Sequence, residues 1–253
     1  MTKVVLLGAG NLAYHLFQVI NNTNSVEVIQ VYNHQSEKLK QFEGTTAITT
    51  DKDQIKEADI YLISVKDDAI PEVASILISK EGLVVHTAGA VTINALSKNT
   101  NFGVFYPLQS FSKNKKVDFK EIPICIEANS KENLSKLKIL ASKLTNLVYE
   151  ISSEQRQVLH VAAVFANNFS NHMLATADSI CAKNEIPFEI LKPLIAETFQ
   201  KINSMAPKEA QTGPAIRNDK KTMQKHLSYL TNDQKNIYKT LSESILKSNG
   251  KKL

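Results

Sequence analysis

The chain opens with a buried-strand pattern that runs directly into a glycine-rich turn. Lys3–Leu7 is a short, mostly apolar run, which is typical of a parallel strand covered on both faces. The turn Gly8-Ala9-Gly10-Asn11-Leu12-Ala13 follows at once, and apolar residues at helical spacing continue to Ile20. A second strand pattern, Val26–Val31, completes a strand–helix–strand unit. Because such a unit connects parallel strands, this opening indicates a parallel α/β sheet.

The glycine turn has the Gly-x-Gly-x-x-Ala spacing of a dinucleotide-binding turn. Gly8 would permit the tight turn, Gly10 would let the backbone approach a pyrophosphate, and Ala13 would keep the helix close to the sheet. Asn11 and Leu12 begin the helix, where free N–H groups favour an anion. The alternative is a glycine turn in another α/β fold that binds no dinucleotide.

The end of the second strand indicates which dinucleotide is preferred. A protein that binds NAD(H) places Asp or Glu there to accept hydrogen bonds from the ribose hydroxyls. This chain has Asn33-His34-Gln35-Ser36 instead, with no Arg. Asn33, His34 and Ser36 could donate hydrogen bonds to a 2′-phosphate, and Lys38 could add a positive charge. We therefore expect NADP(H) rather than NAD(H), while a polar loop without a ligand role explains His34 equally well.

Strands and helices continue to alternate through the first 151 residues. Further strands are expected at Ile60–Val65, Leu83–His86, Gly103–Tyr106, Ile122–Ile126 and Leu147–Tyr149, with helices over 68–79 and 130–145. From residue 152 the pattern is helical, with a Ser-Ser-Glu-Gln start signal and a long run over 154–183. We predict a doubly wound Rossmann-type domain over residues 1–151, followed by an all-helical domain over residues 152–253.

Polar and small residues follow the predicted strands at the carboxyl edge of the sheet, where open α/β folds bind ligands. Ser64, Val65 and Lys66 end one strand, and Lys66 could contact a phosphate or the substrate. Thr87 and Gly89 follow another strand, and Gly89 would allow the backbone to come close to the cofactor. These five residues join the turn as candidate cofactor contacts.

Four polar residues are candidates for the reaction itself. His86 ends a strand beside the expected nicotinamide pocket, where it could donate to a substrate carbonyl or be satisfied by backbone groups. His160 and Asn168 lie eight residues apart on overlapping faces of the long helix. They could face the substrate or form a hydrogen-bond network between packed helices. Arg217 could hold a substrate carboxylate or pair with an Asp at the domain interface.

Composition and spacing argue against several other classes of protein. The net charge of +5 is spread along the chain without interleaved aromatic residues, so we expect no nucleic-acid binding. No apolar run approaches the roughly 20 residues of a membrane helix and no secretory signal is visible, which makes a cytoplasmic location the default. The six histidines form no close pair with Cys or carboxylate, so no metal site is expected.

Several further motifs together point to one family. They are Ser64–Ile70, His86–Ala90, Tyr106–Phe111, His160–Asn168 and Thr212–Asp219. With these motifs the chain resembles Rossmann-like proteins related to pyrroline-5-carboxylate reductase and deazaflavin-dependent NADP oxidoreductases, in a bacterial branch with its own C-terminal domain of unknown function. The resemblance covers nearly the whole chain. It implies an NADP-linked fold, a helical dimerisation domain and an active site between the domains.

The leading hypothesis is an NADP-dependent oxidoreductase that transfers a hydride to or from a small C=N or C=O substrate, as a homodimer through the helical domain. One alternative is a dinucleotide-binding sensor or scaffold without hydride transfer. Tyr106, where such proteins often have His, and Ala88, where they often have Ser, are consistent with it. The other alternative is a pyrroline-5-carboxylate reductase proper, which the different C-terminal loop motifs disfavour.

Overall fold

The structure, a computed structural model, describes residues 1–250, so the end of the predicted helical domain lies outside the described residues. Two compact units divide after Ala163. The helical part of the chain begins earlier, with α5 (Ser153–Ala163), and its start signal forms as expected. The Ser152 N–H donates to Gln155 Oε1 (2.9 Å), and the Gln155 N–H donates to Ser152 Oγ (3.2 Å). The predicted boundary at residue 151 lies just before the C-terminal run of helices, whereas the two units divide after α5, which belongs to the first unit.

The first unit is built on an eight-stranded sheet with the order β3-β2-β1-β4-β5-β6-β7-β8. The strands are β1 (Thr2–Leu7), β2 (Val26–Tyr32), β3 (Ala47–Thr49), β4 (Ile60–Ile63), β5 (Leu83–His86), β6 (Phe102–Pro107), β7 (Ile124–Ala128) and β8 (Val148–Glu150). The order of the first six is that of the Rossmann fold, which confirms the predicted fold class. Only β6 and β7 pair antiparallel, because the segment between them holds a 3-10 turn and no crossover helix.

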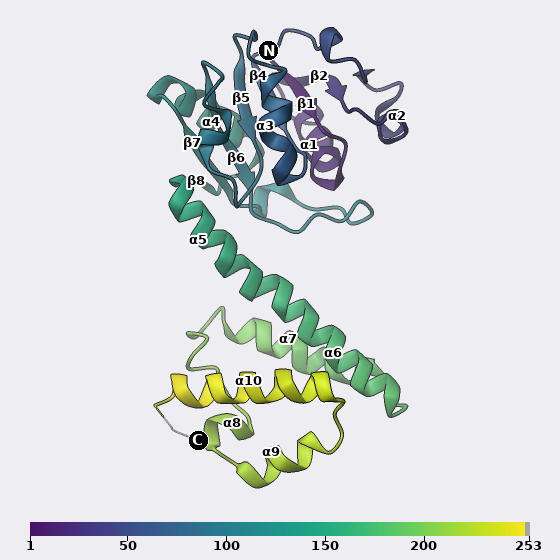
Figure 1. Ribbon diagram of the computed structural model, residues 1–253, viewed down its shortest axis with the longest axis vertical. Helices are drawn as coiled ribbons and strands as arrows, with labels where there is room; N and C mark the ends of the chain where they lie inside the picture. The colour runs from purple at the N-terminus through teal and green to yellow at the C-terminus, as the bar shows by residue number, and fades with distance from the viewer. Residues whose placement is uncertain (251–253) are drawn as a thin grey trace. The chain divides into compact units, whose positions relative to one another are not determined.

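Helices cover both faces of this sheet (Figure 1). One face packs against α1 (Asn11–Asn21) and α4 (Lys131–Leu144), and the other packs against α3 (Ile70–Ser75). Successive β1 side chains alternate between the two cores: Val4 and Leu6 face the first, while Val5 and Leu7 face the second. The continuous apolar run in the sequence follows from this double covering.

Three elements differ from the sequence-based expectation. Strand β3 was not expected, because its three residues are too short to show a period. The helix expected over 68–79 is a 3-10 turn, Asp67–Ala69, followed by the short α3, which has Pro71 in its first turn. The long helix is interrupted by a π-helical segment, Val164–Phe169. A π-helix has more residues per turn than an α-helix. The α-helical rotation of 100° per residue, which put His160 and Asn168 on overlapping faces, therefore does not hold across this segment.

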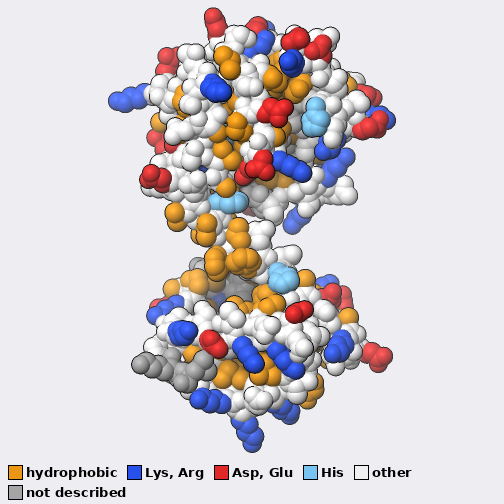
Figure 2. Space-filling model, viewed as in Figure 1, with side chains coloured by type: hydrophobic (Ala, Val, Ile, Leu, Met, Phe, Trp, Pro, Cys, Tyr) orange, Lys and Arg blue, Asp and Glu red, His pale blue; other side chains and the backbone are white. Residues whose placement is uncertain are grey.

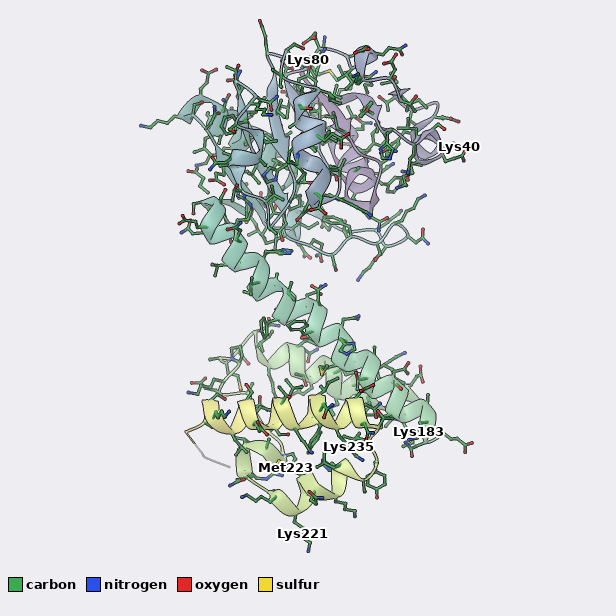
Figure 3. The ribbon with its side chains drawn as sticks, in the orientation of Figure 1. Lys40, Lys80, Lys183, Lys221, Met223 and Lys235 are labelled. Carbon is green, nitrogen blue, oxygen red and sulfur yellow. The ribbon has the colours of Figure 1, made fainter. Side chains whose placement is uncertain are left out.

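The second unit is helical. Its elements are the π segment, α6 (Ser170–Lys183), a 3-10 turn (Phe188–Leu191), α7 (Lys192–Lys201), α8 (Pro214–Arg217), α9 (Lys220–Leu227) and α10 (Asn232–Ser248). Asp219 caps α9 by accepting the Thr222 N–H (3.0 Å), and Thr231 with Gln234 forms a capping box on α10. Met223 of α9, labelled in Figure 3, is one of its buried side chains. Over residues 1–250, no helix combines the length and apolar character needed to cross a membrane.

Candidate active site

The turn after β1 is fixed by a close approach between two strand ends. Gly8 has a φ of +118°, and a Cβ atom there would collide with the Ser64 carbonyl oxygen. The Gly8 N–H donates to the Tyr32 carbonyl at the end of β2 (2.8 Å), and the Ser64 N–H donates to the Leu7 carbonyl (2.7 Å). Only glycine accommodates both the conformation and the contact. The carboxyl ends of β1, β2 and β4 therefore meet at this turn.

The N-terminus of α1 presents its backbone donors to an open space. No side chain caps the helix, and Gly10 before it has φ −82° and ψ −174°. A Cβ on Gly10 would meet nothing within 4 Å. The Ala9 carbonyl accepts from Gln41 Nε2 (3.0 Å), so the Gly10 N–H of the same trans peptide points away from Gln41. Free donors at the positive end of a helix form a site for an anion such as a pyrophosphate.

A cleft of about 870 Å³ lies over this turn. All of the predicted cofactor contacts except Gly89 line it: Gly8, Gly10, Asn11, Leu12, Asn33, His34, Ser64, Val65, Lys66 and Thr87. Ala88, the neighbour of Gly89, lines the cleft as well. The residues come from the ends of four strands, β1, β2, β4 and β5, so the cleft runs along the carboxyl edge of the sheet.

The β2 end of the cleft carries amide, imidazole and ammonium groups but no carboxylate. Asn33 is buried, and its side-chain nitrogen donates to the Gln35 carbonyl (3.0 Å). His34 and Lys38 are exposed and line the cleft beside it. Lys40 pairs with Glu37 instead (2.8 Å). Lys38 therefore places a positive charge at this end of the cleft.

A tyrosine–histidine pair lies next to Gly89. Tyr106 Oη and His160 Nδ1 are 3.1 Å apart, and the two rings meet edge to face. A Cβ on Gly89 would lie 2.6 Å from His160 Nδ1 and 2.9 Å from Tyr106 Oη. Gly89 thus makes room for this pair, a role that its sequence context did not reveal. Burial raises the pKa of Tyr106, which keeps the phenol protonated at neutral pH.

His86 is fully buried and does not line the cleft. Its Nδ1 accepts the Ala88 N–H (3.2 Å), and among the described residues its Nε2 has no partner of good hydrogen-bonding geometry. Burial, and secondly the charge of Arg156, lower the pKa of His86 to about 4, although the Thr92 backbone opposes the shift. His86 is therefore neutral at pH 7. Its position favours support of the Thr87–Ala88 backbone over donation to a substrate.

A buried ion pair, which the sequence interpretation missed, fastens α5 to the first unit. Arg156 is fully buried and donates to Glu127 of β7 (2.6 Å) and to the Val91 carbonyl (2.6 Å). Ser153 Oγ donates to the same carboxylate (2.7 Å). Charged residues near a helix start usually face solvent, so the sequence pattern did not predict that Arg156 is buried. Its spacing of four residues from His160, which places both on one helix face, was the available signal.

The other two candidate residues belong to the second unit. Asn168 is exposed in the π segment, and Arg217 is exposed at the end of α8. Their expected convergence with His160 on a substrate stays a prediction. Of the four candidates for the reaction, His86 contacts the Ala88 N–H and His160 lies against Gly89.

Comparison with known proteins agrees with this architecture. Residues 3–89 match the family model of coenzyme F420-dependent NADP oxidoreductases, and residues 122–245 match a domain of unknown function, DUF2520. A comparison with curated proteins gives no significant match.

Solved structures extend the comparison to the whole chain. A crystal structure of a "putative NADP oxidoreductase" from Bacteroides fragilis is 43% identical, has a TM-score of 0.89 and covers 96% of this chain and 97% of its own. The chain therefore belongs to its family, the NAD(P)-dependent Rossmann oxidoreductases that carry a DUF2520 domain. Two more distant structures share the fold. Protein TM1727 from Thermotoga maritima is 18% identical (TM-score 0.73, 98% of each chain), and 1-pyrroline-5-carboxylate reductase from Streptococcus pyogenes is 13% identical (TM-score 0.63, 98% of each chain).

The buried His86 predicts a loss of stability in mild acid. Below pH 6.5 the unfolded chain binds a proton at this residue, whereas the folded protein does so only near pH 4. Stability therefore falls as the pH falls through this window, by about 2 kcal/mol between pH 7.5 and pH 5. Urea unfolding at both values measures this, and His86→Gln should reduce the difference. His172→Gln, at an exposed position, is the control; an unchanged pH dependence in His86→Gln would contradict the assignment.

Proposed function

We propose that this protein is an NADP(H)-dependent oxidoreductase that transfers a hydride to or from a small C=N or C=O substrate. The observation that carries the proposal is the cleft over the uncapped start of α1, beside a glycine with open space in place of a side chain. The name of the Bacteroides fragilis relative, which mentions NADP, supports the choice of cofactor. The lack of a carboxylate at positions 33–36, directly after β2, supports it independently.

Each part of the cleft suits one part of the cofactor. The backbone N–H groups at Gly10 and Asn11 would hold the pyrophosphate. Asn33, His34 and Lys38 would surround the adenosine 2′-phosphate, while Ser64–Lys66 and Thr87 would line the path toward the nicotinamide. When bound, the nicotinamide supplies or accepts the hydride. The chain itself positions the reactants and polarises the acceptor.

The candidates for substrate contact keep distinct roles. His160 lies beside Gly89, which follows the lining residue Ala88, and would face the acceptor group. His86 would hold the backbone there through the Ala88 N–H. Asn168 would donate to the substrate from the helical domain, and Arg217 would bind a substrate carboxylate. The cytoplasmic location also remains a prediction.

We also propose that the helical domain forms a homodimer. Its buried apolar side chains in the described range are few: Cys181, Ala215, Met223 and Leu246. Large apolar side chains remain exposed on it, among them Phe165 (65%), Ile190 (66%) and Leu194 (64%), and Figure 2 shows apolar side chains at its surface. Exposed apolar patches of this kind mark protein interfaces in soluble proteins. A second copy of the chain would cover these exposed apolar side chains.

Gly10→Ala should weaken NADPH binding without destabilising the fold. The new methyl group would occupy the space into which the pyrophosphate must come, while the backbone conformation suits alanine. We expect a Kd at least about tenfold higher in a calorimetric titration, a loss of roughly 1.4 kcal/mol, with an unchanged Tm. Gly8→Ala is the contrasting variant, because its Cβ would strike the Ser64 carbonyl and lower the Tm. If Gly10→Ala bound NADPH with wild-type affinity, the pyrophosphate would not bind at this turn.

Lys38→Ala tests the preference for NADP(H). Removing its ammonium should weaken NADPH binding about fivefold and leave NADH binding unchanged, because only NADPH carries the 2′-phosphate. Lys40→Ala is the matched control, because Lys40 pairs with Glu37 and does not line the cleft. Lys40 is labelled in Figure 3. An equal loss of affinity for NADPH and NADH would show that Lys38 does not contact the 2′-phosphate.

The homodimer predicts a mass near twice 28.1 kDa in sedimentation equilibrium. Ile190→Glu combined with Leu194→Glu should shift the protein toward monomer, because two charges would be buried in the interface. Lys183→Glu, at an exposed position of α6, should leave the mass unchanged. A wild-type protein that sediments as a monomer at micromolar concentration would contradict the dimer.

A further inference from the structure

We propose that Tyr106 is the proton donor of the reaction and that His160 is the hydrogen-bonded partner that stabilises its phenolate. The inference rests on the proposed function for its substrate class, and it assigns a role that the sequence motifs did not suggest. The observation behind it is the contact of Tyr106 Oη with both His160 Nδ1 and the side-chain-free position Gly89.

Tyr106 does not itself line the cleft, but it approaches Gly89, the residue that follows the lining residues Thr87 and Ala88. It stands near the carboxyl end of β6, next to β5, whose following residues Thr87 and Ala88 line the cleft. Asp67, another lining residue, is close enough to raise the pKa of Tyr106. Only 9% of Tyr106 is exposed, so its hydroxyl is largely shielded from water. A shielded hydroxyl beside the reacting end of a cofactor site is well placed for proton transfer.

The groups around the phenol suit a proton donor. Burial is the main cause that raises the pKa of Tyr106, and Cys125 and Asp67 act in the same direction. The phenol therefore keeps its proton at neutral pH until a substrate nitrogen or oxygen develops negative charge. Arg156 acts in the opposite direction, because its buried positive charge favours the phenolate. His160 is the partner in direct hydrogen-bond contact.

The proposed step moves one proton. As the acceptor carbon receives a hydride from reduced nicotinamide, the Tyr106 O–H bond breaks and its proton passes to the acceptor nitrogen or oxygen. The bonding pair stays on Oη as a phenolate, which accepts a hydrogen bond from His160 Nδ1–H. A proton from solvent then restores the phenol, while His160 keeps its Nδ1–H. In the oxidative direction the same phenolate accepts the proton.

This role requires a defined direction for the Tyr106–His160 hydrogen bond. If His160 Nδ1–H donates, the Tyr106 proton is free for the substrate. If Tyr106 donates to Nδ1, its proton is already engaged and the pair is a packing contact. The direction can be measured without any substrate, from the ionisation of Tyr106 followed by tyrosinate absorbance, with Tyr106→Phe subtracted to isolate its signal.

His160→Phe is the decisive variant for that titration, because it keeps an aromatic ring of similar size. Loss of a donor to the phenolate should raise the pKa of Tyr106. Loss of an acceptor for the phenol should lower it, and this result would overturn the proposal. Tyr149→Phe, at a half-exposed position on β8, is the control and should leave the Tyr106 signal in place.

Turnover provides the second readout. Against a panel of cyclic imines and α-keto acids, Tyr106→Phe should lower kcat about 10²-fold to 10³-fold while the Kd for NADPH stays within about twofold. Tyr149→Phe should retain wild-type kcat. Wild-type kcat in Tyr106→Phe would overturn the proposal. If the wild-type protein binds NADPH but reduces no compound, the proposed function fails on its own, and the titration still decides the direction of the Tyr106–His160 bond.

Discussion

The approach of Gly8 to the Ser64 carbonyl determines where ligand chemistry can occur in the first unit. Because this position has no side chain, β1 can turn into α1 directly beside the end of β4. The Gly8 N–H simultaneously fixes the end of β2. Three strand ends and one uncapped helix therefore border a single cleft. The positive φ of Gly8, the parallel sheet and the free N-terminus of α1 together form a site for an anion, which none of them forms alone.

The position of α5 depends on a different kind of interaction. The buried Arg156–Glu127 pair holds the first turns of α5 against β7 and the Val91 carbonyl. One turn further along, the same helix places His160 against Tyr106. A buried ion pair is a weak source of net stability, but breaking one is costly, so it specifies position well. The turn thus offers backbone donors, whereas the Tyr106–His160 contact depends on the position that Arg156 gives to α5.

Much of this arrangement could be predicted from local pattern. The apolar run before Gly8 and the Gly-x-Gly-x-x-Ala spacing were sufficient for the Rossmann sheet and for most residues of the cleft. The Tyr106–His160 pair could not be predicted in this way, since the two residues lie 54 positions apart and meet only because Arg156 orients α5. The π segment was equally hidden, because its apolar residues keep a spacing that an α-helix would also show.

The proposed function requires that a dinucleotide binds with its pyrophosphate at the start of α1. An NMR titration of the isotope-labelled protein with NADPH is the sharpest test, because each backbone amide reports separately. We expect saturable shifts that are largest at Gly10, Asn11 and Leu12, with smaller shifts at the end of β2. NADPH binding that leaves these amides unchanged, or no binding at millimolar concentration, would contradict it.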